Sequence, residues 1–204
     1  LLKSLDKLAI GEIVSPTDAA GDLVVLLDDD GSPIGAAPKA TVHGTETALH
    51  LAFSCHVFDA DGRVLVTRRA LVKRTWPGVW TNSFCGHPQP GESIEGAIAR
   101  HAGNELGLTL QRVEVVLPRF RYRATDAGGT VENEICPVYT AFATDEPRPN
   151  PAEVAEYAWV DPTRLGAALQ ATPWAFSPWL VLQSEQLSAY RPVPSAAASV
   201  GGPS

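Results

Sequence analysis

One stretch of the sequence, residues 80–108, constrains the fold more than any other. It reads WTNSFCGHPQPGESIEGAIARHAGNELGL and predicts a strand end, a turn rich in proline and glycine, and a helix over residues 92–106 that Gly107 ends. Cys85 and His87 stand directly before the turn, and the helix carries several carboxylates. We therefore expect one site, in which a soft ligand or nucleophile on the strand faces hard oxygen ligands on the helix.

The charge of the chain is unevenly distributed. With 204 residues, of which 45% are hydrophobic, the chain can bury one sizeable core. Its net charge of −7 argues against nucleic acid as a partner, yet ten of its sixteen basic residues lie between Arg63 and Arg123. Cations gathered around the stretch described above favour a small anionic ligand, and the plainer alternative is a solvated basic face.

The cysteine content predicts a reducing compartment. Cys55, Cys85 and Cys136 are too few and too odd in number for a disulfide framework, and no CxxC pair indicates structural zinc. No stretch approaches the roughly 20 apolar residues that span a membrane. We therefore expect a cytoplasmic protein that binds neither nucleic acid nor membrane and that is a monomer or a weak homodimer.

The rest of the chain divides into an arm, a domain and a tail. We expect residues 1–20 to form a loosely docked N-terminal arm, residues 21–190 to form the domain, and residues 191–204 to form a disordered low-complexity tail. Apolar runs bounded by turn sequences predict strands at residues 22–28, 49–58, 63–69, 113–124 and 131–143. The second and third of these should pair as a hairpin through a DADG turn. Pro137 should lie at a sheet edge or bulge, because it cannot donate a backbone hydrogen bond.

Two glutamates share one face of the last predicted strand. Glu132 and Glu134 are two residues apart, so both carboxylates point to the same side of the sheet. Two like charges side by side are costly unless a cation lies between them or one of them is protonated. The pair therefore predicts a metal or a shared proton, and the alternative is a solvent-facing pair.

Three histidines could join these carboxylates. His43 and His50 lie seven residues apart, at the approach to the predicted hairpin, and His87 lies in the strand end described above. Taken alone, each is more typical of an ordinary surface or strand residue. Together with Glu132 and Glu134 they would provide five ligands. A mixed nitrogen and oxygen set of this size suits an octahedral divalent metal such as manganese or magnesium, with zinc as the common competitor.

Residues 80–108 resemble the Nudix box, the signature of enzymes that hold a diphosphate through magnesium. The matching positions are Gly86, Glu92, Arg100, Glu105, Gly107 and Leu108. His101 and Asn104 stand where the helix of the box has two further glutamates, so only Glu105 remains of the cluster that positions metals for hydrolysis. The resemblance therefore implies a protein that binds a diphosphate but lacks the glutamates that position metals for its hydrolysis.

A closer resemblance covers residues 23–183 and is to the type I isopentenyl-diphosphate isomerases. It rests on the degenerate box together with the segments TNSFCGHP, FRYRA and VENEICPV. It implies an α+β fold in which a Nudix-like mixed sheet is sandwiched between helices, with an N-terminal arm and a C-terminal helix. It also implies an enzyme of isoprenoid biosynthesis that interconverts isopentenyl and dimethylallyl diphosphate by protonation and deprotonation through a tertiary carbocation. The alternatives are a Nudix-type hydrolase, a related enzyme that uses the same cation for chain coupling or cyclisation, and a non-catalytic binding module.

The same resemblance assigns metal-binding and acid–base roles. The first metal site would comprise His43, His50, His87, Glu132 and Glu134. A second ion, Mg²⁺, would arrive with the substrate's diphosphate and bind Glu105 and the backbone carbonyl of Cys85. Cys85 and Glu134 would be the two acid–base groups, with Tyr122 as a hydrogen-bonding neighbour of Glu134.

The resemblance also assigns cations and an aromatic ring to the substrate, a small allylic or homoallylic diphosphate. The diphosphate-binding cations would be Lys39, Arg69, Lys73 and Arg100. His101 stands where many relatives have a further arginine. Trp179 matches the family's tryptophan, whose π face would stabilise the carbocation. Its neighbourhood, TPWAFSPWLVLQ, is by itself more typical of a core than of a site, so this residue has two competing interpretations.

Overall fold

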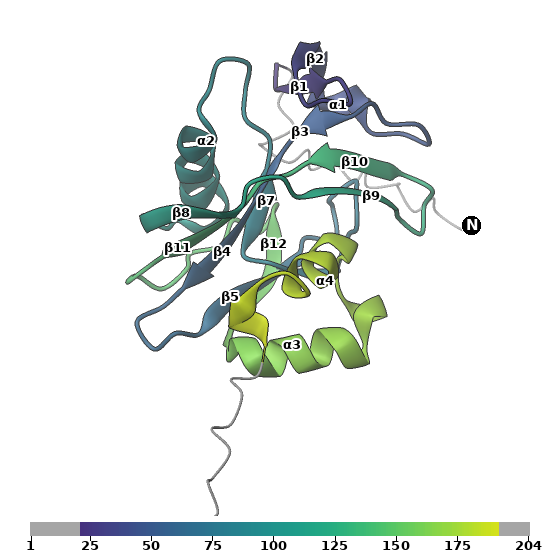
Figure 1. The fold of residues 1–204 in the computed structure, drawn as a ribbon. Coiled ribbons are helices and arrows are strands. Elements are labelled where there is room, and N and C mark those ends of the chain that lie inside the picture. Colours follow the sequence, from purple (N-terminus) through teal and green to yellow (C-terminus); the bar gives the residue numbers. More distant parts are fainter. Residues whose placement is uncertain (1–20, 192–204) are drawn as a thin grey trace, which may run out of the picture.

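The structure is a computed structural model in which residues 21–191 are described. The predicted arm and all but the first residue of the predicted tail lie outside the described residues. The described part of the chain folds into two β-sheets, with helices packed on both faces of the larger one (Figure 1). The predicted α+β fold with a mixed sheet between helices is confirmed.

The smaller sheet has five strands in the order β2-β1-β3-β10-β9. Their bounds are β1 (Leu23–Leu27), β2 (Pro33–Pro38), β3 (His50–Leu51), β9 (Arg121–Thr125) and β10 (Val131–Ile135). The parallel pairing of β3 with β10 sets His50 beside Glu134, and the antiparallel pairing of β9 with β10 sets Tyr122 on the other side of the same glutamate. Strand register alone therefore brings three candidate site residues together.

The larger sheet has seven strands, with the path β12-β5-β4-β11-β8 and two short strands, β6 on β5 and β7 on β4. Their bounds are β4 (Phe53–Phe58), β5 (Val64–Arg69), β6 (Trp80–Thr81), β7 (Phe84–Gly86), β8 (Gln111–Leu117), β11 (Val138–Phe142) and β12 (Val154–Val160). The β4/β11 pair is parallel and the other pairs are antiparallel, so the sheet is mixed.

Three segments that we predicted as single strands each pass from one sheet to the other. Residues 49–58 divide into β3 and β4, residues 113–124 into β8 and β9, and residues 131–143 into β10 and β11. Pro118 and Pro137 lie in two of the breaks, where a missing backbone donor is tolerated because regular pairing stops there. Pro137 lies between β10 and β11, next to the register shift at Val138 and Tyr139, which agrees with the predicted position near a sheet edge or bulge.

The predicted hairpin is correct only at its turn. β4 and β5 pair through Phe58 and Val64 and then diverge, and β6 and β7 occupy the space between them. Side chains bridge part of this gap, since the Ser83 hydroxyl donates to the Leu65 carbonyl and accepts from the Val57 N–H. This divergence places the segment around Cys85 between the two strands, in the middle of the molecule.

The helices cover opposite faces of the larger sheet (Figure 1). Their bounds are α1 (Lys39–Val42), α2 (Ile94–His101), α3 (Pro162–Ala171) and α4 (Pro178–Ser184), and residues 173–175 and 188–190 form 3-10 turns. Alternate residues of β5 enter two separate cores: Val64 and Val66 pack in the core that includes α3 and α4, whereas Leu65 packs in the core that includes α2. No helix within residues 21–191 is long and apolar enough to cross a membrane.

The helix of the stretch 80–108 begins at Ile94 and changes character before it ends. Ser93 caps its N-terminus, where the side-chain oxygen accepts from the Gly96 N–H at 3.1 Å. Residues Ala102–Leu106 continue it as a π-helical turn, and Gly107 closes it with φ +62°. Such π turns widen the helix and are frequent at functional sites. Here the turn carries Glu105, whose carboxyl side chain is buried.

Candidate active site

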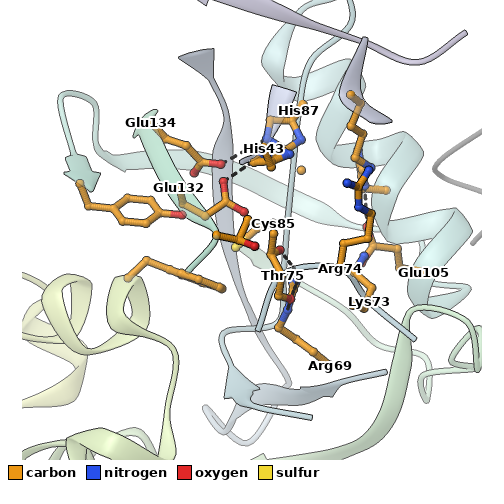
Figure 2. A pocket seen from close by; sticks show the side chains of 16 residues that line it. His43, Arg69, Lys73, Arg74, Thr75, Cys85, His87, Glu105, Glu132 and Glu134 are labelled. Atoms are coloured by element: carbon orange, nitrogen blue, oxygen red, sulfur yellow. Dashed lines mark hydrogen bonds and ion pairs between the residues drawn. The ribbon is translucent and has the colours of Figure 1, made fainter. Parts of the chain in front are cut away.

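A polar cavity lies where the two sheets meet (Figure 2). It draws its walls from both sheets, from α2 and the π turn, and from α4. Its lining residues are Lys39, His43, Arg69, Lys73, Arg74, Thr75, Cys85, Gly86, His87, His101, Glu105, Tyr122, Thr130, Glu132, Glu134 and Trp179. Nearly every residue to which we assigned a role from the sequence lines this cavity, and Arg100 and His50 are the two that do not. His50 lies directly behind the lining, as the histidine contacts below show.

Three histidine rings converge on one wall of the cavity. The ring centroids of His43, His50 and His87 lie 5.1–5.7 Å from one another, although the three residues come from separate parts of the chain. His50 Nδ1 lies 2.9 Å from the Ala48 carbonyl, so Nδ1 carries a proton and donates it to that oxygen, and Nε2 faces the other two histidines. The backbone thus orients this ring before any ion binds.

The two glutamates complete this cluster. His43 Nε2 lies 2.9 Å from Glu132 Oε2, and His50 Nε2 and His87 Nε2 lie 3.5 Å and 3.2 Å from Glu134 Oε1. Both carboxylates and the His50 ring are buried, whereas His43 and His87 are partly buried. The structure therefore brings together all five residues that the sequence analysis named as ligands.

The donor atoms of this cluster suit a divalent cation. One ligand atom from each of His43, His50, His87 and Glu134 can be chosen so that all four lie within 4.8 Å of one another. The ligands of a six-coordinate ion bound at about 2.1 Å lie about 3–4 Å apart, so the cluster approaches the required spacing. His43 Nε2, His50 Nε2, His87 Nδ1 and Glu132 Oε2 are buried and have no hydrogen-bond partner among the described residues.

Those unpartnered atoms favour a metal site over a cluster of ion pairs. The 2.9 Å contact of His43 with Glu132 lacks hydrogen-bond geometry, because both atoms count among the unpartnered ones. Buried polar atoms without hydrogen-bond partners are costly. A divalent cation bound in this cluster would satisfy them. The residues present therefore fit a divalent metal.

The protonation states of His87 and Glu134 agree with this interpretation. Burial lowers the pKa of His87 to about 3, so the ring is neutral, which is the form that binds metals. Burial alone would raise the pKa of Glu134, but hydrogen bonds from His50 and His87 outweigh it and hold that pKa well below its usual range. For His50 the neighbouring Glu134 and Glu132 outweigh burial, and the pKa is raised.

Cys85 reaches the cavity from β7 as a neutral thiol. Burial raises its pKa to about 12, against opposing hydrogen bonds from Ser54 and Asn82. The Asn82 amide nitrogen donates to the carbonyls of Cys55 and Phe84 at 3.0 Å and 2.8 Å, so its Oδ1 is left as an acceptor. Cys85 Sγ lies 3.2 Å from that oxygen and must be the donor. Sequence analysis missed Asn82, although it stands within the TNSFCGHP segment.

Trp179 is both a core residue and a wall of the cavity. Its ring is 2% exposed and packs edge-on against Trp76, and its Nε1–H donates to Asn82 Oδ1 at 2.9 Å. The Arg69 guanidinium lies 5.7 Å from the ring centroid. The two interpretations offered for this residue are therefore not exclusive, because one face of the ring serves the core while the ring also lines the site.

Tyr122 lies next to Glu134 without bonding to it. The two residues are cross-strand partners, but no hydrogen bond joins the phenol to the carboxylate among the described contacts. Burial and the charges of Glu134 and Glu132 raise the tyrosine pKa well above its usual value, so the phenol keeps its proton. The expected hydrogen bond is absent here, while the expected proximity is present.

Three of the four predicted diphosphate cations line the cavity. Arg69 is held by the Thr75 carbonyl at 2.8–3.0 Å and by its hydroxyl at 3.0 Å, while Lys73 pairs with Glu153. Lys39 enters from α1. Arg74, which sequence analysis missed, also lines the cavity and donates to the Ala40 carbonyl.

Arg100 does not join these cations. Its guanidinium binds both Glu92 carboxylate oxygens at 2.7–2.9 Å and the His87 carbonyl at 3.1 Å, outside the cavity lining. Glu92 and Arg100 together fasten the turn to the helix. Arg100 thus has structural contacts and does not line the cavity, and its contact with the diphosphate stays a prediction.

Glu105 and His101 form the helical wall of the cavity. Glu105 Oε1 accepts from His101 Nδ1 at 2.6 Å, and its other oxygen has no partner among the described residues. A Cβ at Gly86 would lie 2.5 Å from the His101 ring, so this position excludes every side chain. Packing against the His101 ring therefore explains why position 86 is a glycine. His101 also lines the cavity, whereas the sequence analysis noted it only as a substitute for a glutamate or arginine of the family.

Comparisons with known proteins agree with the fold and with the cavity. The NUDIX domain family matches residues 48–180. An isopentenyl-diphosphate Delta-isomerase of Clavibacter sepedonicus is 70% identical over 162 residues, covering 79% of this chain and 85% of that protein. Another, of Agromyces mediolanus, is 65% identical over 174 residues, covering 85% of this chain and 84% of that protein.

Solved structures show the same fold. A Deinococcus radiodurans protein superposes with a TM-score of 0.55 at 20% identity, covering 74% of this chain and 90% of that one. A MutT NUDIX hydrolase of Burkholderia pseudomallei superposes with a TM-score of 0.51 at 25% identity, covering 69% of this chain and 98% of that one.

Proposed function

The chain belongs to the NUDIX domain family and, within it, to the isopentenyl-diphosphate Delta-isomerases, and we propose that the cavity of Figure 2 is where it interconverts isopentenyl and dimethylallyl diphosphate. The reaction moves a double bond by one carbon and belongs to isoprenoid biosynthesis. One observation carries the assignment of the site. Cys85 and Glu134 reach a single buried cavity from different sheets, and one is held as a proton donor while the other is ionised.

In the proposed mechanism these two groups exchange protons with the hydrocarbon end of the substrate. The Cys85 thiol gives its proton to the terminal alkene carbon, which leaves a thiolate and a tertiary carbocation. The Glu134 carboxylate then removes a proton from the neighbouring methylene, and those C–H electrons form the new double bond. The reverse reaction uses the same two groups with their roles exchanged.

The cation between these two steps needs an electron-rich and dry environment. The buried Trp179 ring lines the same cavity and offers its π face. The Tyr122 phenol, which keeps its proton, lies beside Glu134 and can donate a hydrogen bond to it once the substrate is bound. The buried side chains that wall the cavity would limit the water that could otherwise trap the cation.

We propose that Lys39, Arg69, Lys73 and Arg74 hold the diphosphate. All four line the cavity, and the contacts of Arg69, Lys73 and Arg74 fix where the charges of these three side chains lie. The diphosphate would be a small, multiply charged anion, which matches a cluster of positive charge in a chain that is acidic as a whole.

Two metal ions complete the proposed site. Manganese or magnesium would be held by His43, His50, His87, Glu132 and Glu134, with zinc as a competitor, and a second Mg²⁺ by Glu105 with the Cys85 carbonyl. When bound, these cations would offset the negative charge of the buried carboxylates and of the diphosphate. The protein's contribution is to arrange the ligands and to orient their rings through groups such as the Ala48 carbonyl.

The proposed function is tested by one incubation with three distinguishable products. Isopentenyl diphosphate, Mg²⁺ and the protein are combined in deuterated water. Deuterium-labelled dimethylallyl diphosphate is the expected product. Release of inorganic phosphate would instead favour a Nudix-type hydrolase, and unchanged substrate would favour a non-catalytic binding module.

A cation-stabilising role of Trp179 predicts unequal effects of two substitutions. An aromatic ring facing a cation in a desolvated pocket is worth about 2 kcal/mol, which is roughly thirtyfold in rate. We therefore expect Trp179→Leu to lose about thirtyfold in kcat and Trp179→Phe to lose much less. Turnover is measured together with the thermal midpoint, because loss of the Asn82 hydrogen bond and of core packing also lowers stability. Equal turnover by the folded fractions of the two variants would return Trp179 to the core alone.

A further inference from the structure

A row of buried polar side chains leads from Cys85 away from the cavity. The Ser54 hydroxyl lies 3.2 Å from Cys85 Sγ and 2.8 Å from Gln183 Nε2. Gln183 Oε1 lies 2.9 Å from His56 Nε2, and His56 Nδ1 lies 2.6 Å from the Tyr190 hydroxyl. Ser54, His56 and Gln183 are 0% exposed and Tyr190 is 3% exposed. Buried polar rows need complete hydrogen bonding to be stable, so the direction of each bond matters.

The direction of the row is set at its far end, at Tyr190. Among the described residues, His56 Nδ1 is the only hydrogen-bond partner of the Tyr190 hydroxyl. If the ring nitrogen were the donor, the buried phenolic proton would have no acceptor, which costs more than an unused lone pair. Tyr190 therefore donates to His56 Nδ1.

The same direction continues through His56 and Gln183. Burial lowers the pKa of His56 to about 4, so the ring is neutral and carries one proton. With Nδ1 accepting, that proton is on Nε2 and is donated to Gln183 Oε1. The Gln183 amide nitrogen then faces Ser54 and donates to its oxygen.

The row ends at the Ser54 hydroxyl, which can donate a hydrogen bond to a cysteine sulfur. Ser54 has accepted from Gln183, so its single proton is available to Cys85 Sγ at 3.2 Å or to Cys136 Sγ at 3.4 Å. A thiol can also act as a hydrogen-bond donor, so Cys136 can donate to the Ser54 oxygen and leave the Ser54 proton for Cys85. Cys85 Sγ is then held on two sides: it accepts from Ser54 and donates to Asn82 Oδ1.

We infer that Ser54, Gln183, His56 and Tyr190 are positioning residues, whose aligned donors hold Cys85 Sγ in the orientation from which it transfers a proton to the substrate. The inference rests on the proposed role of Cys85 and deepens it. None of the four residues lines the cavity, so each acts through Cys85 alone. Aligned hydrogen bonds polarise one another, which makes the last bond, from Ser54 to sulfur, stronger than an isolated one.

Gln183 offers the sharpest test, because one substitution reverses its hydrogen bond to Ser54 while keeping the side-chain shape, and another removes both of its hydrogen bonds in the row. Gln183→Glu keeps the shape of the side chain but replaces the donor by an acceptor, which would turn the Ser54 hydroxyl away from Cys85. Gln183→Met keeps the volume and removes both bonds. We expect each to lower kcat about tenfold in the Mg²⁺-loaded enzyme and to leave KM about unchanged. Tyr139→Phe, which removes the hydroxyl of a tyrosine that packs in the other core, is the control and should not change kcat.

A spectroscopic readout follows the thiol itself. The S–H stretching band of Cys85 is obtained as the Raman difference between the parent enzyme and Cys85→Ala, and its frequency reports the hydrogen bonds of the sulfur. We expect this band to shift in both Gln183 variants and to stay in place in Tyr139→Phe. Thermal midpoints are recorded so that kcat refers to folded enzyme.

The outcomes distinguish this inference from the proposed function. An unshifted band, or a Gln183→Glu enzyme with the kcat of the parent, would overturn the positioning role even if the parent is an active isomerase. If the parent gave no labelled dimethylallyl diphosphate, the proposed function would fail, whereas the band shift would still show whether the row reaches Cys85. A shifted band together with a tenfold lower kcat at constant KM supports the inference.

Discussion

Cys85→Ala is expected to lower kcat about a thousandfold while leaving the affinity for a diphosphate nearly unchanged. Positioned acid–base groups contribute about 10²–10⁴ in rate, and this substitution removes one of the two that face the substrate. The thiol reaches the cavity from β7, whereas the diphosphate cations come from α1, from the end of β5 and from the loop after it. The catalytic thiol and the diphosphate-binding cations therefore lie on different elements, so kcat can fall while the affinity for the diphosphate is unchanged.

The measurement needs a ligand that binds but cannot react. Isopentyl diphosphate has the same head and no double bond, so its dissociation constant reports binding alone. Cys55→Ala is the matched control, because Cys55 is fully buried in the core beside α2 and does not line the cavity. Near-normal turnover by Cys85→Ala would show that this thiol is structural.

Glu134→Gln tests the other half of the acid–base pair. A similar loss of kcat is expected, because the amide cannot take up the proton that leaves the substrate. The carboxylate also faces His50 and His87, so the variant is assayed at saturating metal to separate proton transfer from metal affinity. Full activity under these conditions would assign the second proton transfer to another group.

The parts of the site that follow from short-range geometry could be predicted from the sequence. Glu132 and Glu134 share a face because side chains alternate along a strand, and the structure has both buried in β10. The helix after Pro90 and its closing glycine follow from local turn and capping chemistry, so its position was predicted within two residues.

The parts that depend on the paths of strands could not be predicted in this way. Hydrophobic alternation continues across the breaks at Ala52 and Pro137, so a single long strand and two strands in different sheets have the same pattern. Those breaks nevertheless create the cavity, because they carry each segment from one sheet to the other at the level of the site.

Contacts between side chains that are far apart in the chain could not be predicted from the sequence either. Asn82 accepts hydrogen bonds from both Cys85, three residues away, and Trp179, which is far away in the sequence. Arg100 matched a family position but pairs with Glu92, eight residues away, and not with the cavity. Residue type and spacing indicate which groups are available, whereas only packing decides which of them meet.

His87→Ala is expected to lower the affinity for the bound divalent metal about a hundredfold. Loss of groups that merely support a ligand costs about 10–100-fold, and this substitution removes a proposed ligand itself. Its Nδ1 is buried and unpartnered, and its ring lies 5.1 Å from that of His50. Without a cation, the buried Glu132 and Glu134 would repel each other, so activity should fall together with metal content.

Metal content is measured directly by elemental analysis after dialysis, and metal binding by the rise in thermal midpoint on adding Mn²⁺ or Mg²⁺ to protein stripped with a chelator. A ligand at about 100 times its dissociation constant stabilises a protein by about 2.7 kcal/mol, and a hundredfold weaker site loses most of that. His56→Gln is the matched control, since the ring nitrogens of His56 bond to Gln183 and Tyr190, and none of these three residues lines the cavity. Equal metal content in His87→Ala and His56→Gln would mean that the converging histidines do not hold the ion.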